Sequence, residues 1–145
     1  LIVSKTTHDV LLLGAKSDIA LNDSIRDLVD TDQRVRVHNL AGRTSLRESY
    51  QIMRKCTLAV VNDNAPLHLA QAAGIPTFAI FGATVPEYGF GPQHPDDKVF
   101  EVDLVCRPCT RQGSRSCPIN TLECLKKVSA DDVFKEIRKL LEVRQ

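Results

Sequence analysis

The stretch VVNDNAPLHLAQAAGIP, residues 60–76, decides the fold class of this chain. An apolar run ends in Asn-Asp-Asn, and a run rich in Ala and Leu follows it directly. The second run stops at Gly74, with Pro76 just beyond, which is typical of a helix C-terminus. Pro66 falls in the first turn of that run, where its missing N–H is tolerated. The stretch therefore predicts a buried strand, a tight corner and a helix.

The same alternation extends outward from this corner in both directions. Three apolar runs are continuous, which is typical of strands buried on both faces: residues 9–15, 58–63 and 77–83. Shorter strands are predicted at 34–42 and 99–104, and amphipathic helices at 17–30, 44–56, 65–74 and 129–145. Strands that alternate with helices predict an α/β fold, here a Rossmann-like three-layer domain with a mainly parallel sheet. We expect residues 58–61 to lie inside that sheet and not at its edge.

Bulk composition excludes several classes of protein. The 145 residues are 43% hydrophobic and 26% charged, which is typical of one soluble globular domain. The net charge of +1 gives no electrostatic case for nucleic acid or for an anionic membrane surface. No apolar run approaches the ~18 residues that span a bilayer. The opening LIVSKTTHDV lacks Met and any secretory signal, so we expect a chain cut from a longer cytoplasmic protein.

The predicted corner offers a site for an anion. In open parallel sheets, ligands bind beyond the carboxyl ends of the strands, where Asp63 and Asn64 lie. The following helix presents unpaired N–H groups and the positive end of its dipole to a phosphate, and His68 follows within about one turn. The alternative is purely structural: Asp63 or Asn64 caps the helix, and His68 is a half-buried packing residue.

A second loop leaves the next predicted strand at the same edge. It reads FGATVPEYGFGP, residues 81–92. Gly82 lets the backbone approach a ligand closely, and Thr84 can hydrogen-bond a phosphate or a ribose. The alternative is an ordinary surface loop built from turn residues. The pattern G-x-G-x-x-G is absent, which argues against a standard nicotinamide site.

Four segments, in one order and at one spacing, resemble the C-terminal half of the ADP-heptose:lipopolysaccharide heptosyltransferases, the ninth family of glycosyltransferases. They are NLAGRTSLRES at 39–49, CTLAVVNDNAPLHLAQAAGIPTFAIFGATVPEYGFGP at 56–92, the pattern CRPC…CP…C at 106–124, and SADDVFKEI at 129–137. The resemblance implies a glycosyltransferase-B fold, in which two Rossmann-like domains enclose the active site. Residues 1–145 would then form the C-terminal nucleotide-sugar-binding domain, without the N-terminal acceptor domain and without their own first strand.

The resemblance also implies the residues that hold the donor. The sequence motif of the family is Asp, then Ser or Thr, then Gly, then two variable residues and His. Asp63 and His68 match this motif. Asn64 and Ala65 stand where the family has a hydroxyl residue and Gly. In the second loop, Gly82 and Thr84 match the family's Phe/Tyr-Gly-Pro-Thr-Asp-Pro pattern, with Ala83 for Pro and Val85 for Asp. At the start of the helix at 44–56, Glu48 is the candidate for contact with the donor nucleoside.

A family member transfers heptose from ADP-heptose to the lipopolysaccharide inner core and releases ADP. By that resemblance the catalytic base lies in the N-terminal domain, so no catalytic residue is expected here and this chain alone should be inactive. No cofactor is required for transfer. The acceptor would be bound through the missing domain, and the whole enzyme would work in the cytoplasm, with peripheral contact to the inner membrane possible.

The last unusual feature is a Cys-rich insert at residues 106–124. Cys106, Cys109, Cys117 and Cys124 read C-x2-C-x7-C-x6-C, and only the first pair has regular metal-ligand spacing. A structural zinc or an iron–sulfur centre is one interpretation, and free or disulfide-linked thiols are the other. Three arginines lie among these cysteines and either contact an anionic acceptor or are simply solvated: Arg107, Arg111 and Arg115.

Fold alone does not fix function, so three alternatives to a transferase stay open. The chain could be a non-catalytic nucleotide-binding module on the same scaffold. It could be part of a sugar-nucleotide epimerase with the same two-domain architecture. It could also be a redox- or metal-sensing domain built on the four clustered cysteines.

Overall fold

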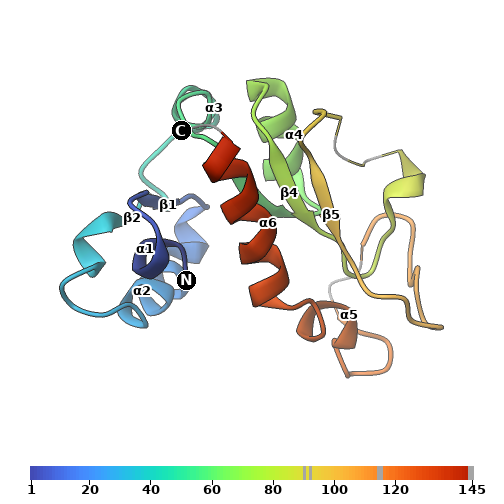
Figure 1. Ribbon diagram of the computed structural model, residues 1–145. Coiled ribbons are helices and arrows are strands. Elements are labelled where there is room, and N and C mark those ends of the chain that lie inside the picture. The colour runs from blue at the N-terminus through green and yellow to red at the C-terminus, as the bar shows by residue number, and fades with distance from the viewer. Residues whose placement is uncertain (90, 92, 114–115, 144–145) are drawn as a thin grey trace. The chain divides into compact units, whose positions relative to one another are not determined.

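The computed structural model describes residues 1–89, 91, 93–113 and 116–143 (Figure 1). Arg115 and two positions of the loop at 81–92 therefore lie outside the described residues. The chain divides into two compact units, Leu1–Ser49 and Tyr50–Gln145. Each unit is built from parallel strands joined by helices.

The first unit holds a two-stranded parallel sheet. Strand β1 (Val10–Leu12) pairs with β2 (Val37–Asn39), with Val10 opposite Val37. A short helix α1 (Ile2–Lys5) precedes β1, and α2 (Ile19–Asp27) forms the crossover between the strands. Two 3₁₀ turns complete the unit, η1 (Lys16–Asp18) and η2 (Arg34–Arg36). At the carboxyl end of β2, the Asn39 amide donates to Ile19 O at 3.0 Å, which ties the strand to α2.

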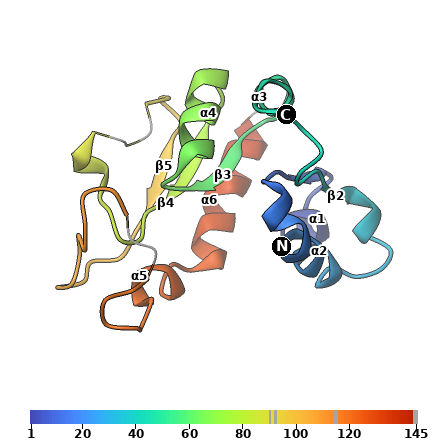
Figure 2. The same cartoon turned by 180° about the vertical axis from the view of Figure 1, so that it is seen from behind.

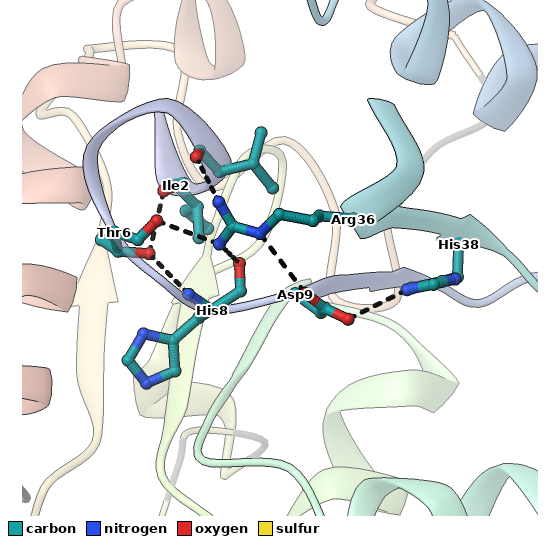
Figure 3. A network of polar contacts seen from close by, with 7 residues as sticks. Ile2, Thr6, His8, Asp9, Arg36 and His38 are labelled. Atoms are coloured by element: carbon teal, nitrogen blue, oxygen red, sulfur yellow. Dashed lines mark hydrogen bonds and ion pairs between the residues drawn. The ribbon is translucent and has the colours of Figure 1, made fainter. Parts of the chain in front are cut away.

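Arg36 fastens the N-terminal segment onto this sheet (Figure 3). Its guanidinium donates to the carbonyls of Val3 at 2.8 Å, Thr6 at 3.0 Å and His8 at 2.5 Å. It also pairs with the Asp9 carboxylate at 3.4 Å. A second hydrogen bond to Asp9, from His38, lowers the pKa of that carboxyl. One side chain thus satisfies three backbone carbonyls in the segment that runs from α1 to β1.

Helix α3 (Leu46–Met53) begins with a capping box. The Ser45 N–H donates to Glu48 Oε2 at 2.8 Å, and the Glu48 N–H donates to Ser45 Oγ at 3.3 Å. These reciprocal bonds satisfy two of the four free N–H groups at the helix start. The backbone hydrogen bond from Ser45 also lowers the pKa of Glu48.

The second unit holds three parallel strands in the order β3 (Ala59–Asn62), β4 (Thr77–Ile80) and β5 (Lys98–Phe100). Helix α4 (Ala65–Ala73) and the terminal helix α6 (Ala130–Val143) lie on opposite faces of this sheet (Figures 1 and 2). A 3₁₀ turn η3 (Pro86–Tyr88) and a short helix α5 (Glu123–Lys126) lie in the connections. The predicted α/β fold with parallel pairing and three layers is confirmed in this unit.

The core of the second unit lies around β4. Leu67 from α4 packs with Ala79 and Phe81, and all three are fully buried. The ring of Phe78, also on β4, lies 5.7 Å from the ring of Phe100 on β5, measured between the ring centroids. Each strand residue of β4 from Thr77 to Ala79 is buried, as expected for the middle strand of a covered sheet.

Two strands differ from their predicted burial on both faces. Strand β3 pairs on one side with β4 and is the outer strand of the described sheet, so the expectation of an interior position is wrong. Val60 of β3 keeps 42% of its surface exposed, because only the other face of this strand packs under α4. Leu11 of β1 is also exposed. An apolar run shows that a strand can be buried on both faces. Which faces are in fact buried depends on the helices that pack against the sheet.

The start of α6 provides a stability test. Ser129 Oγ accepts the Asp132 N–H at 3.2 Å and so caps the helix. Replacing Ser129 by Ala is expected to lower the free energy of unfolding by about 1 kcal/mol, because one helix N–H loses its acceptor. Urea titrations followed by far-UV circular dichroism would measure this, with the exposed Lys135→Ala on the same helix as control. Equal midpoints for the two variants would contradict the prediction.

Candidate functional site

The strand-to-helix corner is built without a side-chain cap. Asn64 is the N-cap residue of α4, with extended backbone (φ −160°), and its side chain makes no capping hydrogen bond. Its carbonyl accepts the Leu67 N–H at 3.0 Å. The interpretation of Asn64 as a simple cap is therefore wrong, and the exposed first turn at Asn64 and Ala65 keeps its N–H groups without a side-chain acceptor from this residue.

Asp63 is engaged by the neighbouring loop. Thr84 Oγ1 donates a hydrogen bond to Asp63 Oδ2, and Thr84 is buried. Below this contact, the Asp63 N–H donates to Ile80 O at 3.3 Å, which continues the pairing of β3 with β4. The structure thus brings together the two loops that follow successive strands. Asp63 braces them, and its carboxylate is already occupied by a hydroxyl donor.

His68 lies on an exposed part of α4, so the interpretation as a half-buried packing residue is wrong. Its Nδ1 is 3.1 Å from Gln71 Oε1, and Gln71 Nε2 donates to Gly91 O at 2.8 Å. Because the Gln71 nitrogen is the donor to Gly91, its oxygen faces His68 and Nδ1 carries the hydrogen. In this arrangement Nε2 would donate to an anion only when the ring is protonated.

The loop at residues 82–84 is held from its other side by the Cys-rich insert. Arg107 donates to Gly82 O at 2.5 Å and to Thr84 O at 2.9 Å, and the Cys109 N–H donates to Ala83 O at 2.8 Å. The Arg107 side chain is only 5% exposed. The interpretation of Arg107 as a solvated loop residue is therefore wrong. No local pattern signals this role, because the partners lie more than twenty positions away.

The four clustered cysteines do not form the predicted metal site. All four are described and are free thiols, and within the described ranges no group of three or more potential ligands could hold a metal ion. Two of the sulfurs contact backbone groups. Cys109 Sγ donates to Cys106 O at 3.1 Å, and backbone N–H groups of the following turn reach Cys117. The metal interpretation is therefore not supported.

The turn after Cys117 changes the chemistry of its thiol. Hydrogen bonds from the backbone of Leu122 and Ile119 lower the pKa of Cys117 to about 7. Asn120 and Leu122 both adopt a positive φ of 55°, which folds the chain back over the sulfur. Burial raises the pKa of Cys109, and the three other thiols of the insert raise it further.

These opposite shifts predict a pH-dependent selectivity of alkylation. Near pH 7 about half of Cys117 should be thiolate, whereas Cys109 should be almost entirely thiol, since its pKa is raised. Iodoacetamide should therefore label Cys117 several-fold faster than Cys109 at pH 7, and the difference should shrink above pH 9. Peptide mass spectrometry after timed labelling would measure both rates. Equal labelling of the two peptides at pH 7 would contradict the lowered pKa.

Glu48 lies in the first unit and is occupied by the capping box of α3. Its contact with a donor nucleoside stays a prediction.

Among the helices of the described ranges, none is both long enough and apolar enough to cross a bilayer.

Comparison with known proteins relates this geometry to one family. The profile of glycosyltransferase family 9 (heptosyltransferase) matches residues 1–119, which include both loops. Lipooligosaccharide heptosyltransferase 2 of Campylobacter jejuni serotype O:6 is 31% identical over 135 residues, covering 92% of this chain and 42% of that protein. Lipopolysaccharide heptosyltransferase 2 of Escherichia coli K12 is 30% identical over 81 residues, covering 56% of this chain and 23% of that protein. The chain thus spans less than half the length of these relatives.

Two solved structures share the fold. The E. coli ADP-heptose LPS heptosyltransferase II superposes with a TM-score of 0.76 at 23% identity, covering 94% of this chain and 37% of that one. The glycosyl transferase family 9 protein of Veillonella parvula superposes with a TM-score of 0.70 at 20% identity, covering 92% of this chain and 36% of that one. These likenesses confirm the Rossmann-like α/β class expected from the sequence. By its match over residues 1–119, this chain belongs to glycosyltransferase family 9.

Proposed function

We propose that this chain is the donor-binding domain of a heptosyltransferase that transfers heptose from ADP-heptose to the inner core of lipopolysaccharide. The observation that carries the proposal is the hydrogen bond from Thr84 to Asp63, which joins the two loops inside the segment matched by the family. The relatives that match this chain are named for heptosyl transfer to lipooligosaccharide or lipopolysaccharide. In this proposal residues 1–145 act together with an N-terminal acceptor domain, and the catalytic base belongs to that domain.

The corner binds the donor diphosphate in this proposal. The exposed N-terminal turn of α4, at Asn64 and Ala65, offers N–H groups and the positive end of the helix dipole. The loop from Gly82 to Thr84 closes the same site from the next strand. Asp63 does not contact the phosphates, because two negative groups repel and because its carboxylate accepts from Thr84. It keeps the two loops at a fixed separation.

The same groups assist departure of ADP during transfer. Negative charge grows on the leaving diphosphate as the bond to the heptosyl carbon breaks. N–H groups that are already oriented stabilise this charge without reorganisation. A protonated His68 adds a positive charge on the same helix. The transfer requires no cofactor, and the donor is a soluble nucleotide sugar, which is consistent with work in the cytoplasm at the inner membrane.

Three residues at the corner favour a second candidate function. Asn64 replaces the usual hydroxyl residue, Ala65 replaces the usual Gly, and Pro66 removes one N–H from the first turn. A methyl group at Ala65 holds a phosphate farther from the backbone, and each lost donor weakens binding of an anion. The second candidate is therefore a nucleotide-binding module that retains ADP without transferring a sugar.

Calorimetric titration of the chain with ADP, with UDP and GDP as controls, tests the donor site. The expected result is binding of ADP in preference to the other two diphosphates. No binding of any of the three would reject both candidates. A transfer assay with ADP-heptose and a lipopolysaccharide core acceptor, on a protein that carries both domains, separates them. Release of ADP with heptosylated product supports the transferase, and ADP binding without product supports the module.

A further inference from the structure

The Cys-rich insert packs on the loop at residues 82–84. Three consecutive carbonyls of this loop, from Gly82, Ala83 and Thr84, each accept a hydrogen bond from the insert. A Cβ at Gly82 would meet the Leu125 side chain at 2.8 Å and Cys124 Sγ at 3.7 Å. The insert therefore packs directly on the backbone of the loop, and Gly82 is needed for this approach.

Arg107 is the centre of these contacts. Its planar guanidinium spans the loop, donating to Gly82 O and Thr84 O, and it also donates to Val102 O. Glu101 balances its charge at 2.8 Å. A buried cation with these four acceptors is held in one orientation, because Nε, Nη1 and Nη2 each donate to at least one of them. A lysine at this position could not bridge the same two carbonyls with a planar fork.

The position of these carbonyls fixes the direction of the amides between them. In a planar trans peptide the C=O and the following N–H point in opposite directions, and the cis bond described in this chain lies elsewhere, at Arg107-Pro108. When Arg107 holds the carbonyls of Gly82 and Thr84, the N–H groups of Ala83 and Val85 are turned away from the insert. The Cys109 N–H holds the carbonyl of Ala83, so the N–H of Thr84 is also turned away from the insert.

The second effect of Arg107 passes through the Thr84 side chain. Thr84 donates its hydroxyl to Asp63 while its carbonyl is held by Arg107. The contacts thus run from Glu101 through Arg107 and Thr84 to Asp63, next to the first turn of α4. Loss of the guanidinium would release one end of this chain of contacts. Thr84 would then be free to leave Asp63.

We propose that Arg107 is a positioning residue for donor binding, which orients the N–H groups of the loop at residues 82–84 toward the diphosphate and keeps Thr84 on Asp63. This inference rests on the proposed function, because it assigns a role within the same donor site. Arg107 does not contact the ligand itself. The insert as a whole would support the loop at residues 82–84 from behind.

The test compares ADP affinity with folding in matched variants of the chain. Arg107→Gln removes the charge and the planar fork, and Arg107→Lys keeps the charge alone. The control is Arg111→Gln, in the same insert, where the arginine lies 6.0 Å from the Tyr88 ring centroid. Calorimetry gives the Kd for ADP, and thermal unfolding reports stability. Amide chemical shifts of residues 83–85 report whether the loop responds to ADP.

We expect Arg107→Gln to raise the Kd for ADP at least tenfold and to lose the ADP-dependent shifts at residues 83–85. Arg107→Lys should recover only part of the affinity, and Arg111→Gln should bind within twofold of the wild type. The double variant Arg107→Gln/Thr84→Val should be little weaker than Arg107→Gln alone, because both changes break one chain of contacts. A merely structural arginine would lower the unfolding temperature and leave the Kd of the folded protein unchanged.

The two proposals fail in different ways. If the wild-type chain binds no nucleoside diphosphate, the proposed function is rejected, and the role of Arg107 falls with it. If the wild type binds ADP and folded Arg107→Gln binds it within twofold, only the role of Arg107 is overturned. Should Arg107→Gln fail to fold, Arg107→Lys decides: full wild-type affinity and loop shifts in that variant would overturn the proposal, and a clear loss of both would support it.

Discussion

Replacement of Phe81 by Ala is expected to lower the free energy of unfolding of the second unit by about 3–5 kcal/mol. Phe81 is fully buried and packs with Leu67 and Ala79, where Val61 also makes contact. Removal of the ring forfeits its burial and leaves a cavity between β4 and α4 that the surrounding backbone cannot fill. Urea unfolding followed by far-UV circular dichroism would show the transition at a markedly lower concentration.

Val143→Ala is the matched control for this prediction. Val143 lies on α6 in the same unit and is 85% exposed, so its truncation should change stability by less than about 0.5 kcal/mol. Phe81→Leu keeps much of the buried volume. Its loss in free energy of unfolding should therefore lie between the losses of Phe81→Ala and Val143→Ala. A loss for Phe81→Ala no larger than that of the surface control would contradict the packing of this core.

Replacement of His68 by Ala is expected to weaken use of the ADP-sugar donor by about 1.5–3 kcal/mol, the scale of one charge-assisted hydrogen bond. The ring contacts Gln71 through Nδ1, and Gln71 in turn donates to Gly91 O. The measurement is kcat/KM for the donor in an enzyme that carries both domains, together with the Kd for ADP.

The control for this prediction is another histidine of the same unit. His94 Nδ1 accepts the Asp96 N–H at 3.1 Å in a different loop, so His94→Ala tests the loss of an imidazole away from the corner. We expect its donor kinetics to match the wild type. If His68→Ala shows equal kinetics as well, with the fold intact, His68 has no part in donor binding.

Local patterns were sufficient for the order and type of the elements. The apolar run before Asp63 and the stop at Gly74 predict β3 and α4, and Gly74 does adopt the left-handed conformation (φ 70°) expected of a helix end. Ser129 likewise predicts its own cap. Such helix ends and caps depend on residues within about four positions, so they can be predicted from the sequence alone. The burial of β3 could not be predicted in this way, because nothing beside Val60 in the sequence shows that its face of the strand stays uncovered.

The candidate site could be predicted only in outline. Asp63 and Thr84 follow successive parallel strands, so their meeting at one edge follows from topology. The hydrogen bond between them, which turns Asp63 into a brace, required the structure. The spacing of Cys106 and Cys109 suggested metal ligands, yet the turn at residues 117–122 directs backbone donors at Cys117. Spacing along the chain does not determine the direction of a sulfur atom.

The hydrogen bonds from Arg107 to the loop at residues 82–84 affect the order in which the protein takes shape during synthesis. A ribosome completes Gly82 and Thr84 well before Arg107, which follows them by 25 and 23 positions. Strands β3 and β4 can pair as soon as both have emerged, whereas the loop carbonyls stay hydrated until the insert arrives. This loop would therefore reach its final form only after residue 107 has emerged. A nascent chain stalled before residue 107 would carry paired strands and an immature binding loop.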